Sequence, residues 1–188
     1  MQQYAIADVA RRVVGVGSVG TRCYVVILED GDTHALLLQA KEAGRSVLEE
    51  HGGIRQPRRL TQLINEQGEG GRVVALQRIL QAVSDPFLGH LRNHSRGRSF
   101  YVRQFHDMKG GLDMQSLDDE PFLQYGQTCA ATLARAHGQS ETAPAIVGYI
   151  GNGEIVANAI VEWAYAYAET NRADHAAFVA ARSEIAAS

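Results

Sequence analysis

The chain has 188 residues, of which 45% are hydrophobic and 21% charged, with a formal net charge of −3. This length is enough for one globular domain or two small lobes with a buried core, and the slightly acidic balance argues against a general nucleic-acid binder. The N-terminus lacks a secretory signal and no apolar run reaches the roughly 20 residues that span a bilayer, so we expect a cytoplasmic protein with neither nucleic acid nor membrane as a partner.

Three glycines near the N-terminus, Gly15, Gly17 and Gly20, lie between two runs rich in β-branched residues. A strand pattern follows Gly20, so the triplet does not open a helix as in dinucleotide-binding folds, and the lysine of a P-loop is missing. A glycine turn between two antiparallel strands covers phosphates in kinase-like sites through backbone N–H groups. These glycines and Ser18 are therefore candidate nucleotide-binding residues. The alternative is a β-hairpin whose glycines only satisfy turn geometry.

A third strand over residues 35–42 follows the hairpin turn Asp30-Gly31-Asp32 and carries Lys41 near its end. Kinase-like folds place their phosphate-binding lysine at this position. Because a strand alternates its faces, Glu42 points away from the side of the sheet that carries Lys41. The alternative is a lysine that keeps a sheet edge soluble.

The next segment is helical in pattern, with a short helix after Pro57 and a stronger one over about residues 72–83. The glycine-rich stretch between them, residues 67–71, predicts a flexible surface loop. Strands are expected around residues 87–91 and 100–105. His90 and His94 have a metal-like spacing, but a zinc site needs three or four ligands, so we expect none here.

The segment after the last strand is the equivalent of a kinase hinge, in which backbone groups meet a nucleobase. Gln104 and His106 are its candidate residues, and the alternative is an ordinary connector that ends in glycine. A helix with acidic residues and proline in its first turn is expected from residue 121 to Gly138.

Two further helices are expected over about residues 155–170 and 173–186, with their aromatic side chains in the core. Cys23 and Cys129 are expected to be buried thiols, because they lie far apart and form no disulfide framework. The predicted fold is α+β. Residues 1–110 form a five-stranded antiparallel sheet with a packed helix, similar to the N-lobe of a kinase, and residues 111–188 form a helical segment.

Several stretches together resemble the bacterial family catalogued as domain of unknown function 2252. These stretches are residues 14–24 (VGVGSVGTRCY), 39–43 (QAKEA), 46–49 (SVLE), 77–78 (QR), 84–89 (SDPFLG), 100–104 (FYVRQ), 107–110 (DMKG) and 133–137 (LARAH). The resemblance implies a kinase-like relationship to small-molecule phosphotransferases.

The resemblance covers only the C-terminal half of these longer proteins. Their N-terminal half carries a Gly-Asp-x-His-x-x-x-Asn-like loop and an Asp-Phe-Asp-like metal motif. Neither occurs here, since the sequence from Gly31 to His34 lies in a hairpin turn and no asparagine follows. No catalytic or metal-binding residue is therefore assigned to this chain.

Kinase-like folds orient the strand lysine with a glutamate from the following helix. Glu49, in the SVLE match, is the first candidate for this role, and Glu69 is the second. Either one is equally explained as a solvated surface carboxylate.

Two classes of function remain open. In the first, the chain is the nucleotide-binding half of a kinase-like phosphotransferase that binds ATP weakly, has no metal site of its own and is inactive alone. In the second, it is a non-catalytic remnant or a protein-interaction module. In either case we expect a homodimer or a complex with a separately encoded chain that carries the missing half.

Overall fold

The computed structural model describes residues 4–13, 15, 19–32, 34–81, 83–106 and 110–187. The chain divides into two compact units, Met1–Gln139 and Ser140–Ser188. Among the described residues, the first unit contains the sheet, three α-helices and the 3₁₀ helix η2 (His94–Arg96), and the second unit contains two α-helices. The division lies after the first long helix that follows the sheet.

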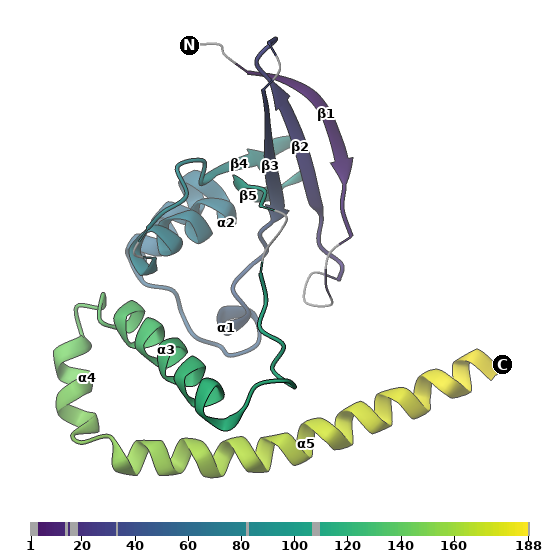
Figure 1. Cartoon of the computed structure of the whole chain (residues 1–188). Helices are drawn as coiled ribbons and strands as arrows, with labels where there is room; N and C mark the ends of the chain where they lie inside the picture. The colour runs from purple at the N-terminus through teal and green to yellow at the C-terminus, as the bar shows by residue number, and fades with distance from the viewer. Residues whose placement is uncertain are drawn as a thin grey trace. The chain divides into compact units, whose positions relative to one another are not determined.

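The first unit is built on a five-stranded antiparallel sheet with the strand order β1-β2-β3-β5-β4 (Figure 1). Its strands are β1 (Ala5–Arg11), β2 (Cys23–Glu29), β3 (Ala35–Glu42), β4 (Gly89–Asn93) and β5 (Arg98–Gln104). The apolar runs of β2 and β3 and the short connections within the β2–β3 and β4–β5 hairpins favour this arrangement. The predicted α+β class with a five-stranded sheet is confirmed.

The β2–β3 turn is formed by the residues that predicted it. The carboxylate of Asp30 accepts the backbone N–H groups of Asp32 and His34 at 3.0 and 3.3 Å, and Gly31 has a φ of 88°, which favours glycine. The N–H of Asp32 is the largest influence that lowers the pKa of Asp30. This turn fixes the register of β2 against β3.

Helix α2 (Arg58–Leu80) crosses the stretch that the sequence predicted to be a surface loop. Gly68 interrupts the helix with a φ of 75° and a ψ of −179°, and Gly68, Gly70 and Gly71 are buried. The prediction of a flexible loop was wrong because these glycines serve close packing instead of a turn. A β-carbon on Gly70 would lie 2.2 Å from the carbonyl oxygen of Phe100.

Helix α2 therefore packs directly on β4 and β5 (Figure 1). The Oγ of Ser99 accepts the N–H of Gly70 at 2.8 Å, and the guanidinium of Arg92 donates to the carbonyl of Asn65 at 2.9 Å. Ser99 and Arg92 are register partners in β5 and β4, so their side chains mark the face of the sheet that α2 covers. We call this the α2 face.

Two more helices complete the first unit, α1 (Val47–Glu50) and α3 (Asp119–His137). Helix α3 matches its prediction, with acidic residues in the first turn, where they complement the helix dipole, and with Gly138 at its end. Cys23 is 3% exposed, as expected for a buried thiol. Cys129 is exposed, so the expectation for this second thiol was wrong.

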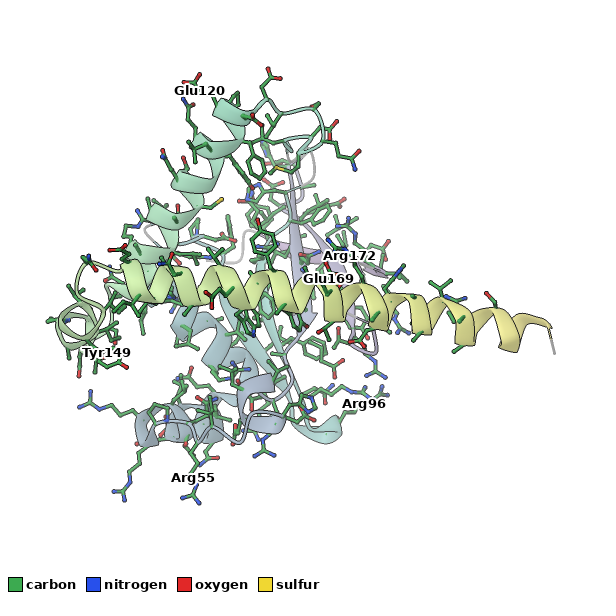
Figure 2. All side chains as sticks on the ribbon, turned by 90° about the horizontal axis from the view of Figure 1, so that it is seen from below. Arg55, Arg96, Glu120, Tyr149, Glu169 and Arg172 are labelled. Carbon is green, nitrogen blue, oxygen red and sulfur yellow. The ribbon has the colours of Figure 1, made fainter. Side chains whose placement is uncertain are left out.

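The second unit contains α4 (Ala143–Ile150) and α5 (Glu154–Ala187). Two helices, over about residues 155–170 and 173–186, were expected where the structure has the single helix α5. Helix α5 is continuous because no glycine or proline occurs between its ends and alanine, the best helix former, is frequent. Its surface carries the ion pair of Glu169 with Arg172 (Figure 2).

The aromatic residues of α5 are exposed, in contrast to the expected core position. Trp163 and Tyr167 are 63% and 52% exposed, and their rings stack with centroids 5.1 Å apart. Tyr165 is also exposed, so these side chains leave an apolar helix surface uncovered. In the part of the chain that the structure describes, no helix is both long and apolar enough to cross a membrane.

Candidate functional site

One row of residues crosses the sheet on the α2 face and includes Lys41. Lys41 is the register partner of Cys23 in β2 and of Tyr101 in β5. The N–H of Arg12 donates to the carbonyl of Cys23 at 2.9 Å. Arg12, the residue directly after β1, therefore also belongs to this row. Residues that face each other across strands share one face of the sheet. Arg12, Cys23, Lys41 and Tyr101 therefore lie side by side on the α2 face.

Glu42 lies on the opposite face, as the alternation of β3 predicts. Its carboxylate accepts the backbone N–H of Arg22 at 3.0 Å and forms ion pairs with the guanidinium groups of Arg22 and Arg98 at 3.5 and 3.4 Å. Glu42 is thereby engaged with two cations on the face away from Lys41. It does not orient this lysine.

Neither glutamate considered for Lys41 forms an ion pair with it among the described residues. Glu49, in α1, pairs with Arg45 at 2.9 Å, and this guanidinium lowers the pKa of Glu49. Glu69, in α2, pairs with Arg72, which also donates to the carbonyl of Gly44. The structure places both carboxylates beside arginines.

The glycine segment joins β1 to β2 at the end of the sheet that carries Lys41. Gly20 lies in a turn with a φ of 85°, and a β-carbon on Gly15 or Gly20 would meet no described atom within 4 Å. Positive φ explains the glycine at position 20. Gly17 and Ser18 lie outside the described residues.

A cation–aromatic contact connects Arg12, three residues before Gly15, with the end of β5. The guanidinium carbon of Arg12 lies 4.7 Å from the centroid of the Phe105 ring, within the range of cation–π attraction. The N–H of Phe105 donates to the carbonyl of Leu37 at 2.9 Å, so Phe105 continues the pairing of β5 with β3. Arg12, three residues before Gly15, is therefore brought to residues 104–106.

Two backbone N–H groups of residues 104–106 are used within the fold. Gln104 donates to the carboxylate of Asp85 at 2.6 Å, and Phe105 donates to Leu37. The other carboxylate oxygen of Asp85 accepts the N–H of Phe87 at 2.8 Å. The side chain of His106 is exposed. A base at this segment would therefore meet its carbonyl groups and His106 rather than these two donors.

Sequence reasoning missed three residues of this region, namely Arg12, Asp85 and Arg103. The signal for Arg103 was present, because a charged residue directly after the apolar run Phe100–Val102 is costly to bury unless it has a partner. Asp85 precedes a proline, a pattern typical of turns whose aspartate accepts backbone N–H groups. Arg12 could be distinguished from Arg11 only with the register of β1 against β2, which places it opposite Cys23.

The described residues contain no group of three histidine, cysteine or acidic side chains that could hold a metal ion. Burial raises the pKa of the Tyr101 phenol in the row beside Lys41. The described face therefore offers cations and a neutral phenol near Lys41.

The opposite face of the sheet contains a separate pocket of about 290 Å³. Its floor is apolar and includes Tyr24 and Phe100, whose ring centroids are 6.0 Å apart. Arg22, Arg96 and Arg98 lie among its lining residues. Lys41 and the glycines do not line it, so the pocket is distinct from the α2 face.

Comparison with known families places the chain in one of them. The profile of the family described as "Uncharacterized protein conserved in bacteria (DUF2252)" matches residues 1–181. The chain belongs to this family. The DUF2252 match includes the sheet, α2 and the helices that follow. No curated protein and no solved structure matches the chain.

Proposed function

We propose that this DUF2252 chain is the nucleotide-binding half of a kinase-like small-molecule phosphotransferase, equivalent to the C-terminal half of longer proteins. The contact of Arg12 with Phe105 supports this proposal, because Arg12 lies three residues before Gly15 and Phe105 lies on the sheet face that carries Lys41. Backbone N–H groups near Gly15, Gly17, Ser18 and Gly20 would hold phosphate oxygens, as in kinase glycine loops.

Lys41 would pair with the α- and β-phosphates of ATP in this arrangement. The base would lie against residues 104–106. Glu49 is retained as a candidate for orienting Lys41 only if ATP draws its carboxylate away from Arg45, with which it pairs in this structure.

ATP binding is expected to be weak. The described part of the chain contains no group of three histidine, cysteine or acidic side chains that could hold a metal ion, so we expect the phosphate charge to be only partly neutralised. We expect a dissociation constant in the high-micromolar range or weaker, about −5 kcal/mol. Isothermal titration calorimetry of the intact chain with ATP and Mg²⁺ tests this, and the absence of a saturable heat would count against the proposal.

The isolated chain is expected to show no phosphotransferase turnover. Phosphoryl transfer requires a positioned nucleophile and neutralisation of charge at the transferred group, and a lysine with a glycine turn supplies only part of this. Steady ATP hydrolysis by the purified chain is the measurement. Hydrolysis that disappears in Lys41→Ala would mean that catalytic carboxylates are present and were overlooked.

Assembly is the second part of the proposal. A half-protein should expose the surface that meets its other half, and α3 and α5 expose large apolar residues. They include Phe122, Leu123, Leu133, Ile155, Ile160, Trp163 and Tyr167. Contiguous apolar patches above a few hundred Å² are rare on monomers. We propose that the helices after Pro121 bind a second copy or a chain that carries the missing half.

Light scattering at micromolar concentration tests this assembly. We expect a dimer of the purified chain, or a larger complex with its partner, with on the order of 1,000 Å² or more buried. A stable monomer without a partner would contradict it. If assembly holds while ATP fails to bind, the exposed helices favour the second class of function, a non-catalytic interaction module.

A further inference from the structure

Arg103 is a partly buried cation that the proposed lysine and glycine site does not use. It lies in β5 as the register partner of Gln39, which is 4% exposed. The Nε of Arg103 is buried and has no hydrogen-bond partner in the described part of the chain. A buried donor without an acceptor costs free energy, and more so when it carries charge. This guanidinium therefore needs an acceptor.

The register places Arg103 near Lys41. Gln39 and Lys41 occupy the same face of β3, and their partners Arg103 and Tyr101 occupy that face of β5. Diagonal neighbours on adjacent strands have β-carbons about 7–8 Å apart or less. The long side chains of Arg103 and Lys41 can therefore reach one common anion.

Arg12 adds a third cation to this face. Its guanidinium lies over Phe105, which follows Arg103 by two residues and so lies on the same side of β5. Among the described residues, Arg12, Lys41 and Arg103 form no ion pair with a carboxylate. Three like charges without a counter-charge repel one another unless an anion lies between them.

We propose that Arg103 is an anion-binding residue that, with Lys41 and Arg12, receives a phosphate-type oxyanion on the α2 face. The inference rests on the proposed function, since a nucleotide would bring such an anion, and it adds Arg103 as a direct ligand. Guanidinium suits this task because it stays charged and its planar donors match phosphate oxygens. The same chemistry would accept the phosphate of a substrate.

Tripolyphosphate carries the phosphate charge of a nucleotide without its base, so its binding tests the anion site alone. Calorimetry of the intact chain should show saturable binding of tripolyphosphate that weakens as salt is raised. Arg103→Gln should weaken this binding about tenfold or more, because a charge-assisted hydrogen bond is lost. Arg103→Lys should recover only part of it. Unchanged affinity in Arg103→Gln, or no binding by the wild-type chain, would overturn the inference.

Two observations keep this test decisive. Circular dichroism of each variant shows whether the sheet is retained, and amide shifts of the wild-type chain with tripolyphosphate should include Arg103 even if its variants fail to fold. ATP binding that depends on Lys41 but not on Arg103 would reject the inference and keep the proposed function. Tripolyphosphate binding that depends on both Arg103 and Lys41, with ATP bound no more tightly than tripolyphosphate, would keep the inference and count against a nucleotide site.

Discussion

Replacing Gly70 with alanine is expected to lower the free energy of unfolding by about 2–3 kcal/mol and the melting temperature by roughly 5–10 °C. The added β-carbon would lie 2.2 Å from the carbonyl oxygen of Phe100, which is backbone and cannot rotate away. Helix α2 would have to move off β5 and weaken the 2.8 Å hydrogen bond from Gly70 to Ser99. Thermal unfolding followed by circular dichroism measures the loss.

Gly126→Ala is the matched control. Gly126 lies inside α3, and a β-carbon there would meet no described atom within 4 Å. Alanine is favoured over glycine in a helix by about 1 kcal/mol, so this variant should be as stable as the wild type or more stable. Equal melting temperatures for Gly70→Ala and Gly126→Ala would contradict the close packing of α2 on β5. Tryptophan fluorescence is unsuitable, because Trp163 lies in α5.

Lys41→Met is expected to weaken ATP binding tenfold or more, which removes the heat of an already weak interaction. A charge-assisted hydrogen bond contributes about 1.5–3 kcal/mol, and 1.4 kcal/mol corresponds to a factor of ten. Methionine keeps most of the length of the side chain, so the packing of β3 beside Cys23 and Tyr101 should persist. Calorimetry with ATP and Mg²⁺ measures the change.

The control for this variant is Arg55→Met, which removes one positive charge at an exposed position far from β3 in the sequence (Figure 2). Because salt screens the interaction between exposed charges, the loss of the Arg55 charge should change the affinity for ATP only slightly. Equal losses in both variants would assign the effect to net charge. An unchanged isotherm for Lys41→Met would remove this lysine from the site.

Much of the sheet could be predicted because its signals are local. The turn at Asp30 and Gly31 and the alternation in β2 and β3 depend on neighbouring residues, and the position of Glu42 opposite Lys41 follows from the period of two. These features are confirmed in the register of the strands.

The errors occurred where distant contacts decide the structure. Gly68, Gly70 and Gly71 favour a loop by their own propensity. However, β5 approaches Gly68 and Gly70 too closely for a β-carbon, and a β-carbon on Gly71 would meet the side chain of Gln67. The break expected after Thr170 has no helix-ending residue, and α5 continues through it. The exposure of Cys129 likewise depends on which element covers α3. The hydrophobic periodicity of the helix does not specify that element.

The candidate site was only partly accessible to sequence reasoning for the same reason. Lys41 and Gly20 could be located from strand order and turn chemistry. Arg12 and Arg103 required the register, since only the pairing with Cys23 and Gln39 places them on the face of Lys41. Glu49 forms an ion pair with Arg45, four residues before it in the sequence. This local ion pair competes with any contact between Glu49 and Lys41 in β3.

The central claim is that the α2 face, not the opposite pocket, is the nucleotide site, and amide chemical-shift mapping of the isotope-labelled chain with ATP and Mg²⁺ tests it most directly. We predict saturable shifts concentrated at Gly20, Lys41 and Phe105. Leu91 and Arg96, which line the opposite pocket, should remain nearly unchanged. Shifts centred on Leu91 and Arg96, or none up to millimolar ATP, would contradict the account.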